Sequence, residues 1–221
     1  MSKTAIILGA TGLTGNLLLQ TLLADDRYGH VTLFSRSTCT LKHPKLTEYI
    51  VDLFQLEHYK DKFRADEVFC CIGTTKTKTS NKTIYSKIDY GIPVAAASLC
   101  TENGIETFVV ISALGAKKKS KIFYNRIKGK MEAAVLEMNI KHTYILQPSL
   151  ISGDREEKRI GESIMKFVMS MLKPILRLGD LKRYQPIHPQ TIANCMVWVA
   201  NNAYPSGRIK SKTIQEIGGD Q

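Results

Sequence analysis

The sequence predicts an α/β fold, a doubly wound parallel sheet with a small C-terminal cap, and three observations support this prediction. Short apolar runs alternate with segments of helical periodicity over most of the 221 residues. The runs are rich in Val and Ile and apolar on both faces, as strands buried in a parallel sheet are. A glycine-rich segment joins the first run to the first helical segment.

Six apolar runs are expected to form the sheet. They are Thr4–Leu8, Val31–Phe34, Glu48–Val51, Glu67–Ile72, Thr107–Ile111 and Thr143–Leu146. Three segments of helical spacing connect them, namely Leu13–Ala24, Thr83–Cys100 and Phe123–Met138. Asn103 and Gly104 follow the second helix as its C-terminal signal. This alternation with short connections is typical of a parallel sheet with helices on both faces.

The pattern changes after Pro148. We take residues 1–148 as the core and residues 149–221 as cap elements of the same single domain. The expected parts of the cap are a polar irregular stretch, a methionine-rich apolar stretch, a helix and a last strand, at Ser149–Gly161, Ser163–Leu176, Gln190–Asn201 and Thr213–Ile217. The methionine-rich stretch fits a cap helix over a substrate pocket or a core element. A membrane-surface or dimer contact is the alternative.

Composition excludes several classes of protein. Hydrophobic residues make up 43% and charged residues 23% of the chain, a globular balance rather than a disordered one. No apolar stretch approaches the roughly 18–20 residues of a transmembrane helix, and the N-terminus lacks a signal-peptide layout. The five cysteines form no CxxC pair and no Cys/His cluster, so no metal site is expected. This cysteine usage fits a reducing compartment and predicts a cytoplasmic protein.

The formal net charge of +11 is compatible with nucleic acid, an anionic membrane or a phosphorylated ligand. The densest basic run consists of Lys117, Lys118, Lys119, Lys121, Arg126, Lys128 and Lys130. A solvated loop and helix face explains this run most simply. The aromatic interleaving typical of single-strand-binding proteins is missing. Nucleic-acid binding, whose signature would be steep loss of affinity with salt, is therefore not favoured.

Three glycines at spacing three lie between the first strand and the first helix. Gly9 permits a tight turn, Gly12 lets the backbone approach a pyrophosphate, and Gly15 lets the helix pack close to the strand. The helix N-terminus presents unpaired N–H groups and a partial positive charge to phosphates. This context predicts a Rossmann-type fold that binds NAD or NADP.

The end of the second strand indicates which dinucleotide binds. NAD-selective folds place an acidic residue there to bind the ribose hydroxyls, but this chain has Arg36. A guanidinium suits a 2′-phosphate, and Ser35 or Ser37 can add a hydroxyl donor. The sequence therefore predicts a preference for NADP(H).

Tyr124 and Lys128 are spaced four residues apart and share one face of the expected helix. The lysine is expected to lower the pKa of the phenol, so that Tyr124 serves as an acid or base near neutral pH. Ser112, at the end of the fifth strand, is placed to hydrogen-bond a substrate oxygen. These three residues are the candidate catalytic set. A half-buried tyrosine and a solvated lysine in a basic helix are the alternative.

These motifs resemble one family. The GxxGxxG spacing is similar to that of the atypical, extended-type short-chain dehydrogenase/reductases. The stretch from Tyr124 to Glu132 resembles the Tyr-x-x-x-Lys-Gly-x-x-Glu segment of one NmrA-like group, that of Tat-interacting protein 30. Cys70–Lys76, Ser112–Ala116 and Gln147–Ser149 resemble the same group. The chain departs from many relatives by having Gln147-Pro148 in place of Arg-Pro, and the match is loose beyond Arg155.

The resemblance implies a Ser-Tyr-Lys triad at Ser112, Tyr124 and Lys128, and it implies that Asp52 contacts the adenine amino group. It also implies that Gly73 and Thr74 lie along the cofactor and that Pro148 and Leu150 lie near the nicotinamide. The candidate cofactor-binding residues are Gly9, Thr11, Gly12, Leu13, Thr14, Gly15, Ser35, Arg36, Asp52, Leu53, Gly73, Thr74, Thr75, Pro148 and Leu150. His188 resembles a turn that packs the C-terminal helix in extended relatives, so we expect it to be structural.

The leading hypothesis is an NADP(H)-dependent oxidoreductase that acts on a carbonyl or alcohol of a small molecule through this triad. The alternative is a non-catalytic NADP(H)-binding sensor or regulatory adaptor that works through a partner protein. The resemblance implies that the helices Thr83–Cys100 and Phe123–Met138 form a homodimer face. The sequence leaves open the substrate, the direction of reaction and the oligomeric state.

Overall fold

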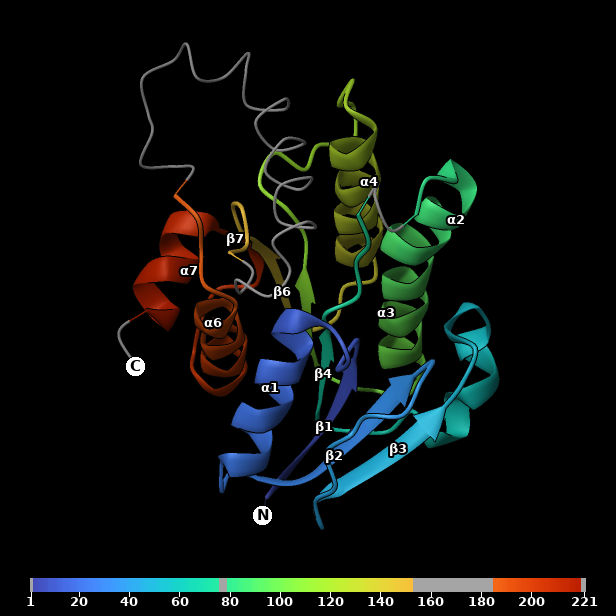
Figure 1. Cartoon of the computed structure of the whole chain (residues 1–221), viewed down its shortest axis with the longest axis vertical. Helices are drawn as coiled ribbons and strands as arrows, with labels where there is room; N and C mark the ends of the chain where they lie inside the picture. Colours follow the sequence, from blue (N-terminus) through green and yellow to red (C-terminus); the bar gives the residue numbers. More distant parts are fainter. Residues whose placement is uncertain (1, 76–78, 153–184, 220–221) are drawn as a thin grey trace.

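A computed structural model of the chain describes residues 2–75, 79–152 and 185–219. Seven parallel strands form one sheet in the order β3-β2-β1-β4-β5-β6-β7 (Figure 1). They are β1 Lys3–Leu8, β2 Tyr28–Ser35, β3 Leu46–Ile50, β4 Glu67–Cys70, β5 Thr107–Ile111, β6 His142–Gln147 and β7 Gly207–Lys210. The first six confirm the predicted strands, with ends that differ by a few residues. The predicted α/β, doubly wound fold is confirmed.

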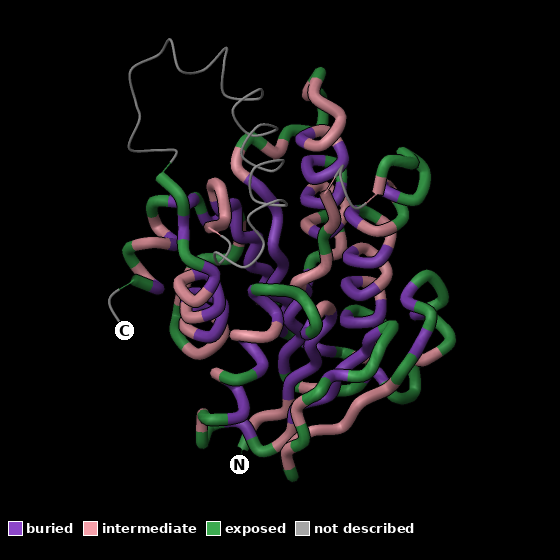
Figure 2. The backbone as a smooth tube through the Cα atoms, in the orientation of Figure 1, coloured by how far each residue is buried: buried purple, intermediate pink, exposed green. Residues whose placement is uncertain are grey.

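Helices cover both faces of the sheet because the strands are apolar on both faces. Along β1, Ala5 and Ile7 belong to one core cluster, and Ile6 and Leu8 belong to the other. The helices α1 (Leu13–Ala24) and α6 (Pro189–Asn201) pack together over the first cluster. The helices α3 (Ile92–Glu102) and α4 (Phe123–Glu137) cover the second. Figure 2 shows the buried strands between these layers.

The predicted helix Thr83–Cys100 contains a π turn. It consists of α2 (Lys82–Ser86), a π segment η2 (Lys87–Gly91) and α3. Pro93 lies in the first turn of α3 and has no N–H with which to continue α-type hydrogen bonds. The Ile92 N–H bonds instead to the carbonyl of Lys87, five residues back. The π turn contains Asp89, which is fully buried.

The C-terminal region contains one wrong prediction. Residues Thr213–Ile217 are not a strand but belong to helix α7 (Ser211–Gly218). Buried Ser211, Ile214 and Gly218 recur at helical spacing, and α7 packs on α6. The strand is instead β7, which pairs with β6 and completes the sheet. The elements from α6 onward thus lie in the layers of the core, while the methionine-rich stretch Ser163–Leu176 lies outside the described residues.

A 3-10 segment, η1 (Leu53–Lys62), connects β3 to β4. His188 caps α6, because its ring nitrogen accepts a hydrogen bond from the Gln190 N–H, which confirms the structural role expected for it. All five cysteines have free thiols. Among the described residues, no helix has the length and apolar character needed to cross a bilayer.

Candidate functional site

The glycine turn between β1 and α1 has the geometry that its spacing predicts. Gly9 has φ +87°, and a Cβ there would lie 3.0 Å from the Cys71 carbonyl. A Cβ on Gly15 would collide with the Gly9 carbonyl oxygen. These two glycines therefore serve the turn and the close approach of the helix, as predicted.

Gly12 has a different environment. A Cβ there would meet only the Gly9 oxygen, at 3.3 Å, and Gly12 is exposed. Gly12 is also the N-cap of α1, where no side chain caps the helix and the first turn holds no acidic residue. The first N–H groups of α1 are thus available to an anion.

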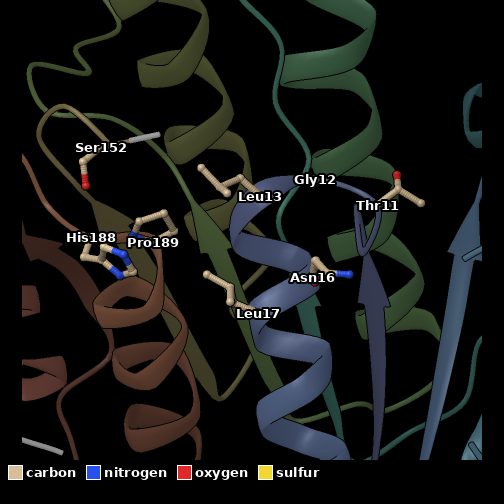
Figure 3. Close-up of a pocket in the computed structure, with 8 residues that line it drawn as sticks. All are labelled: Thr11, Gly12, Leu13, Asn16, Leu17, Ser152, His188 and Pro189. Atoms are coloured by element: carbon tan, nitrogen blue, oxygen red, sulfur yellow. The ribbon is translucent and has the colours of Figure 1, made fainter. Parts of the chain in front are cut away.

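A cavity of about 410 Å³ opens at this helix end (Figure 3). It is lined by Thr11, Gly12, Leu13, Asn16, Leu17, Ser152, His188 and Pro189. The N-termini of α1 and α6 both border it, and Leu13 is 48% exposed. The uncapped helix and the bare Gly12 backbone fit a dinucleotide pyrophosphate. Thr14 is buried within the first turn of α1.

Residues at the ends of β2 and β3 differ in how accessible they are. Arg36 is exposed directly after β2 and takes part in none of the ion pairs in the described ranges. The Ser35 hydroxyl is buried, and its single hydrogen is directed to Glu48 or to the Ser37 carbonyl. Ser35 therefore lacks the free donor that the sequence suggested. Asp52 is exposed and caps η1 through the Phe54 N–H, and the next residue, Leu53, is buried.

Three polar residues form a stripe along α4, four residues apart: Tyr124, Lys128 and Glu132. Lys128 is buried, and its Nζ lies 3.0 Å from Oδ1 of Asp89 and donates to the Ile111 carbonyl at 3.2 Å. Ile111 immediately precedes Ser112. The lysine of the predicted triad therefore lies at the end of β5, between the serine strand and the π turn.

Asp89 also binds the Gly73–Thr74 loop, which follows β4. Its Oδ2 accepts a hydrogen bond from the Thr74 N–H at 2.9 Å, and the Thr74 carbonyl accepts one from Tyr85 at 3.0 Å. A Cβ on Gly73 would lie 3.5 Å from Asp89 and 3.6 Å from the Lys128 ammonium. The turn of Gly73 and Thr74, predicted to follow the cofactor, thus packs directly on the buried ion pair, with Thr75 next to it.

This ion pair alters the expected acid-base chemistry. Burial acts to lower the pKa of Lys128, but the carboxylate of Asp89 and the phenol of Tyr124 outweigh it, so the pKa is raised and the ammonium stays charged. Burial raises the pKa of Tyr124; Lys128 lowers it, and Asp89 raises it again. The net pKa of Tyr124 lies above its ordinary value. Lys128 acts in the expected direction, but burial and Asp89 together outweigh its ammonium, so the expected net lowering does not occur.

Ser112 is part of a second buried network. Its hydroxyl donates to Oε1 of Glu132 at 2.5 Å, and Gln147 donates to the same oxygen at 2.8 Å. The other carboxylate oxygen accepts from Arg208 of β7 at 2.6 Å. Many relatives have an arginine in place of Gln147; in this chain Arg208, on the neighbouring strand β7, supplies a guanidinium instead.

The turn after β6 runs close to the serine loop. The carbonyl of Pro148 accepts a hydrogen bond from the Leu114 N–H at 2.8 Å, two residues after Ser112. Leu150 bonds through its carbonyl to Ile187, which precedes the His188 cap of α6. Pro148 and Leu150 therefore connect the serine loop to the cavity at the α1 end.

Sequence reasoning missed Asp89, Arg208 and Tyr85. Asp89 had one signal in the sequence, namely an acidic side chain in a largely apolar helix, four residues before Pro93. Arg208 has no sequence signal, because its partner Glu132 is 76 residues away. No group of three potential metal ligands occurs in the parts of the chain that the structure covers.

Comparisons with known proteins show the family. The model of the NAD(P)H-binding family matches residues 9–172. Protein HTATIP2 of Rattus norvegicus is 32% identical over 165 residues, which are 73% of this chain and 68% of that protein. The mitochondrial protein FMP52 of Candida albicans is 29% identical over 98% of this chain and 95% of its own length. These matches confirm the resemblance to the atypical short-chain dehydrogenase/reductase group.

Solved structures agree on the fold. The UDP-glucose 4-epimerase of Thermotoga maritima superposes with a TM-score of 0.70 at 14% identity, over 99% of this chain and 84% of its own. At this identity the likeness shows the fold alone.

Proposed function

We propose that this chain, which belongs to the NAD(P)H-binding family, is an NADP(H)-dependent oxidoreductase that interconverts a carbonyl and an alcohol on a small molecule. The observation that carries the proposal is the buried Asp89–Lys128 pair, which connects Tyr124 on α4 to the Gly73–Thr74 turn on the cofactor side. The pair joins the two halves of the expected site.

The residues that would hold the cofactor follow from the cavity and the exposed charge. Thr11, Gly12 and Leu13, with the first N–H groups of α1, would hold the pyrophosphate. Arg36 would bind the 2′-phosphate, because it is exposed and takes part in no described ion pair. Asp52 and Leu53 would flank the adenine. The bound nicotinamide would supply or accept the hydride.

The chain's own residues would manage the proton. The phenol of Tyr124, whose pKa lies above its ordinary value, is protonated near neutral pH and would be the proton donor to a substrate oxygen during reduction. Lys128 would place a fixed positive charge beside the phenolate that remains. Ser112 directs its one hydrogen to Glu132, so its lone pairs are what it offers to a substrate hydroxyl.

Parallel titrations with NADPH and NADH test the cofactor assignment. Wild type is expected to bind NADPH at least about tenfold more tightly. Arg36→Glu should abolish that preference by weakening NADPH binding far more than NADH binding. An equal effect of Arg36→Glu on both dinucleotides would contradict the role of Arg36.

Tyr124→Phe tests catalysis. The variant should keep NADPH binding and lose turnover, since it removes the hydroxyl that would transfer the proton and leaves the proposed cofactor-binding residues unchanged. Turnover at the wild-type rate would refute the role of Tyr124.

Two observations favour a second candidate, a non-catalytic NADP(H) sensor or adaptor. The Ser112 hydroxyl is already engaged by Glu132, and the pKa of Tyr124 is raised rather than lowered. A sensor would bind NADPH in the same way but would turn over no carbonyl compound, and its partner protein would bind differently with and without NADPH.

The compartment is a separate proposal. The five free thiols fit a reducing environment, and we propose the cytoplasm. The fungal relative FMP52 carries the word mitochondrial in its name. Fractionation of cells that express the full chain distinguishes the two, and recovery with mitochondria would overturn the cytoplasmic assignment.

A further inference from the structure

Two segments of the sequence contain many cations and no acid. Residues 107–131 contain seven Lys and Arg and no Asp or Glu, and residues 68–88 contain four Lys and no acid. Of these cations within the described ranges, Lys128 alone forms an ion pair, with Asp89. The two segments provide α2 and the start of α4, which meet at Phe123.

The ring of Phe123 contacts one cation from each of these two helices. Nζ of Lys82, on α2, and Cζ of Arg126, on α4, each lie 5.8 Å from the centre of its ring. The ring of Tyr85 lies 5.6 Å from Phe123 and 6.4 Å from Tyr124. The rings of Phe123 and Tyr85 therefore connect the two cations to the proposed proton donor, Tyr124. We call Lys82, Phe123 and Arg126 the cationic rim.

The guanidinium of Arg126 is held in place by the loop that precedes α4. Its Nη1 donates to the carbonyls of Ser120 at 2.8 Å and Lys121 at 3.2 Å. The loop itself is fixed on α4, since a Cβ on Gly129 would collide with the Lys117–Lys118 backbone. The edge formed by Nε and Nη2 is the fork that binds carboxylate or phosphate in two parallel hydrogen bonds.

We propose that the substrate of the reductase carries a carboxylate or phosphate group, which Arg126 and Lys82 bind at the cationic rim while its carbonyl faces Tyr124. This inference rests on the proposed function and narrows it to anionic carbonyl compounds. Phe123 packs against the apolar part of the substrate. A guanidinium already held by backbone carbonyls binds an anion with little further loss of side-chain entropy.

The test compares probes of matched size with the full chain and NADPH. They are 4-carboxybenzaldehyde, 4-formylphenyl phosphate and the neutral methyl 4-formylbenzoate. At least one anionic probe should show kcat/KM about tenfold or more above that of the ester. Arg126→Gln should reduce this ratio to about one through KM, and Lys82→Gln should reduce it less. Arg126→Lys keeps the charge but loses the fork, so its ratio should lie between that of wild type and that of Arg126→Gln. Lys212→Gln, which removes an exposed charge on α7, is the control and should keep the ratio.

A binding measurement separates this proposal from the proposed function. Saturation-transfer NMR reports whether each probe binds the protein with NADPH, whether or not it is reduced. Binding of an anionic probe that depends on Arg126, without oxidation of NADPH, would support the rim and overturn catalysis. Equal turnover of charged and neutral probes would support catalysis and overturn the rim. Failure of both anionic probes to show Arg126-dependent binding would also overturn the rim. The probe that Arg126 favours identifies carboxylate or phosphate as the recognised group.

Discussion

The amino edge of the sheet buries Glu67, whereas the carboxyl edge buries Asp89 and Glu132, and Glu67 and Asp89 differ in how completely they are paired. At the amino edge, Glu67 accepts from Lys3 at 2.5 Å and from Tyr28 at 2.6 Å. Asn201, at the end of α6, donates to the Tyr28 oxygen, and Lys3 donates to the Ala200 carbonyl. Both oxygens of Glu67 are therefore satisfied. The cluster ties the first strand to the last long helix.

At the carboxyl edge, Asp89 is less completely paired. Its Oδ1 lies 3.0 Å from the Lys128 ammonium but accepts no well-directed hydrogen bond in the described part of the chain. A fully paired carboxylate stabilises an architecture, whereas an incompletely paired one keeps the capacity to accept a further hydrogen bond. We therefore expect the Glu67 cluster at the amino edge to affect stability alone and the Asp89–Lys128 pair at the carboxyl edge to affect turnover as well.

The largest expected effect is that of Asp89→Ala. It leaves the Lys128 ammonium buried without a carboxylate, which should lower the free energy of unfolding by about 3–5 kcal/mol and abolish turnover. Urea denaturation and NADPH oxidation measure the two losses.

The double variant Asp89→Leu/Lys128→Met is the control for this result. It removes both charges and should recover much of the stability but none of the activity. Recovery of activity would show that the ion pair is structural, and the contrast between the two edges would fail.

Gly15→Ala and Gly12→Ala distinguish stability from cofactor binding within the carboxyl edge. The Gly15 Cβ would collide with the Gly9 carbonyl, so this variant should lose about 1–3 kcal/mol of stability.

Gly12→Ala should change stability by less than about 1 kcal/mol, because its Cβ meets only one atom. It should weaken NADPH binding by about tenfold or more, since the methyl group enters the space of the pyrophosphate. Unchanged NADPH affinity in Gly12→Ala would mean that this turn holds no dinucleotide.

Tyr28→Phe tests the amino edge. It removes the hydroxyl that pairs with Glu67 and Asn201, which should cost about 1–2 kcal/mol of stability. NADPH affinity and turnover should match those of wild type, because the cluster lies at the opposite edge of the sheet. A variant with wild-type stability and impaired turnover would reverse the assignment of the two edges.

The smallest effect is a pH dependence at Glu67. Burial raises the pKa of Glu67 above its ordinary value of 4.5, and the hydrogen bonds from Lys3 and Tyr28 only partly oppose this. A carboxyl whose folded pKa is raised contributes stability that is fully present below its unfolded pKa and is lost as pH rises through the folded value. The stability of wild type relative to Glu67→Gln should therefore fall as pH rises from about 4.5. A difference that stays constant with pH would show that the pKa of Glu67 is not raised.

Local patterns predicted the glycine turn and six of the seven strands, because both depend on short-range properties. Gly9 needs positive φ, and buried parallel strands are apolar on both faces. The same reasoning failed at β7, where Ile209 is the one buried residue and charged neighbours mark an edge strand. It failed again at Thr213–Ile217, whose β-branched residues suggested a strand until packing on α6 selected a helix.

The sequence by itself determined that this chain folds as a doubly wound parallel sheet with a dinucleotide turn, and that Tyr124 and Lys128 share a helix face. Tertiary structure decided the charge environment of those two residues. Asp89 lies in a π turn and pairs with Lys128, and Arg208 lies on β7 and pairs with Glu132. Neither partner follows from spacing along the chain. Electrostatic interactions in a buried site depend on distances through space and on desolvation, and both are set only when the layers pack.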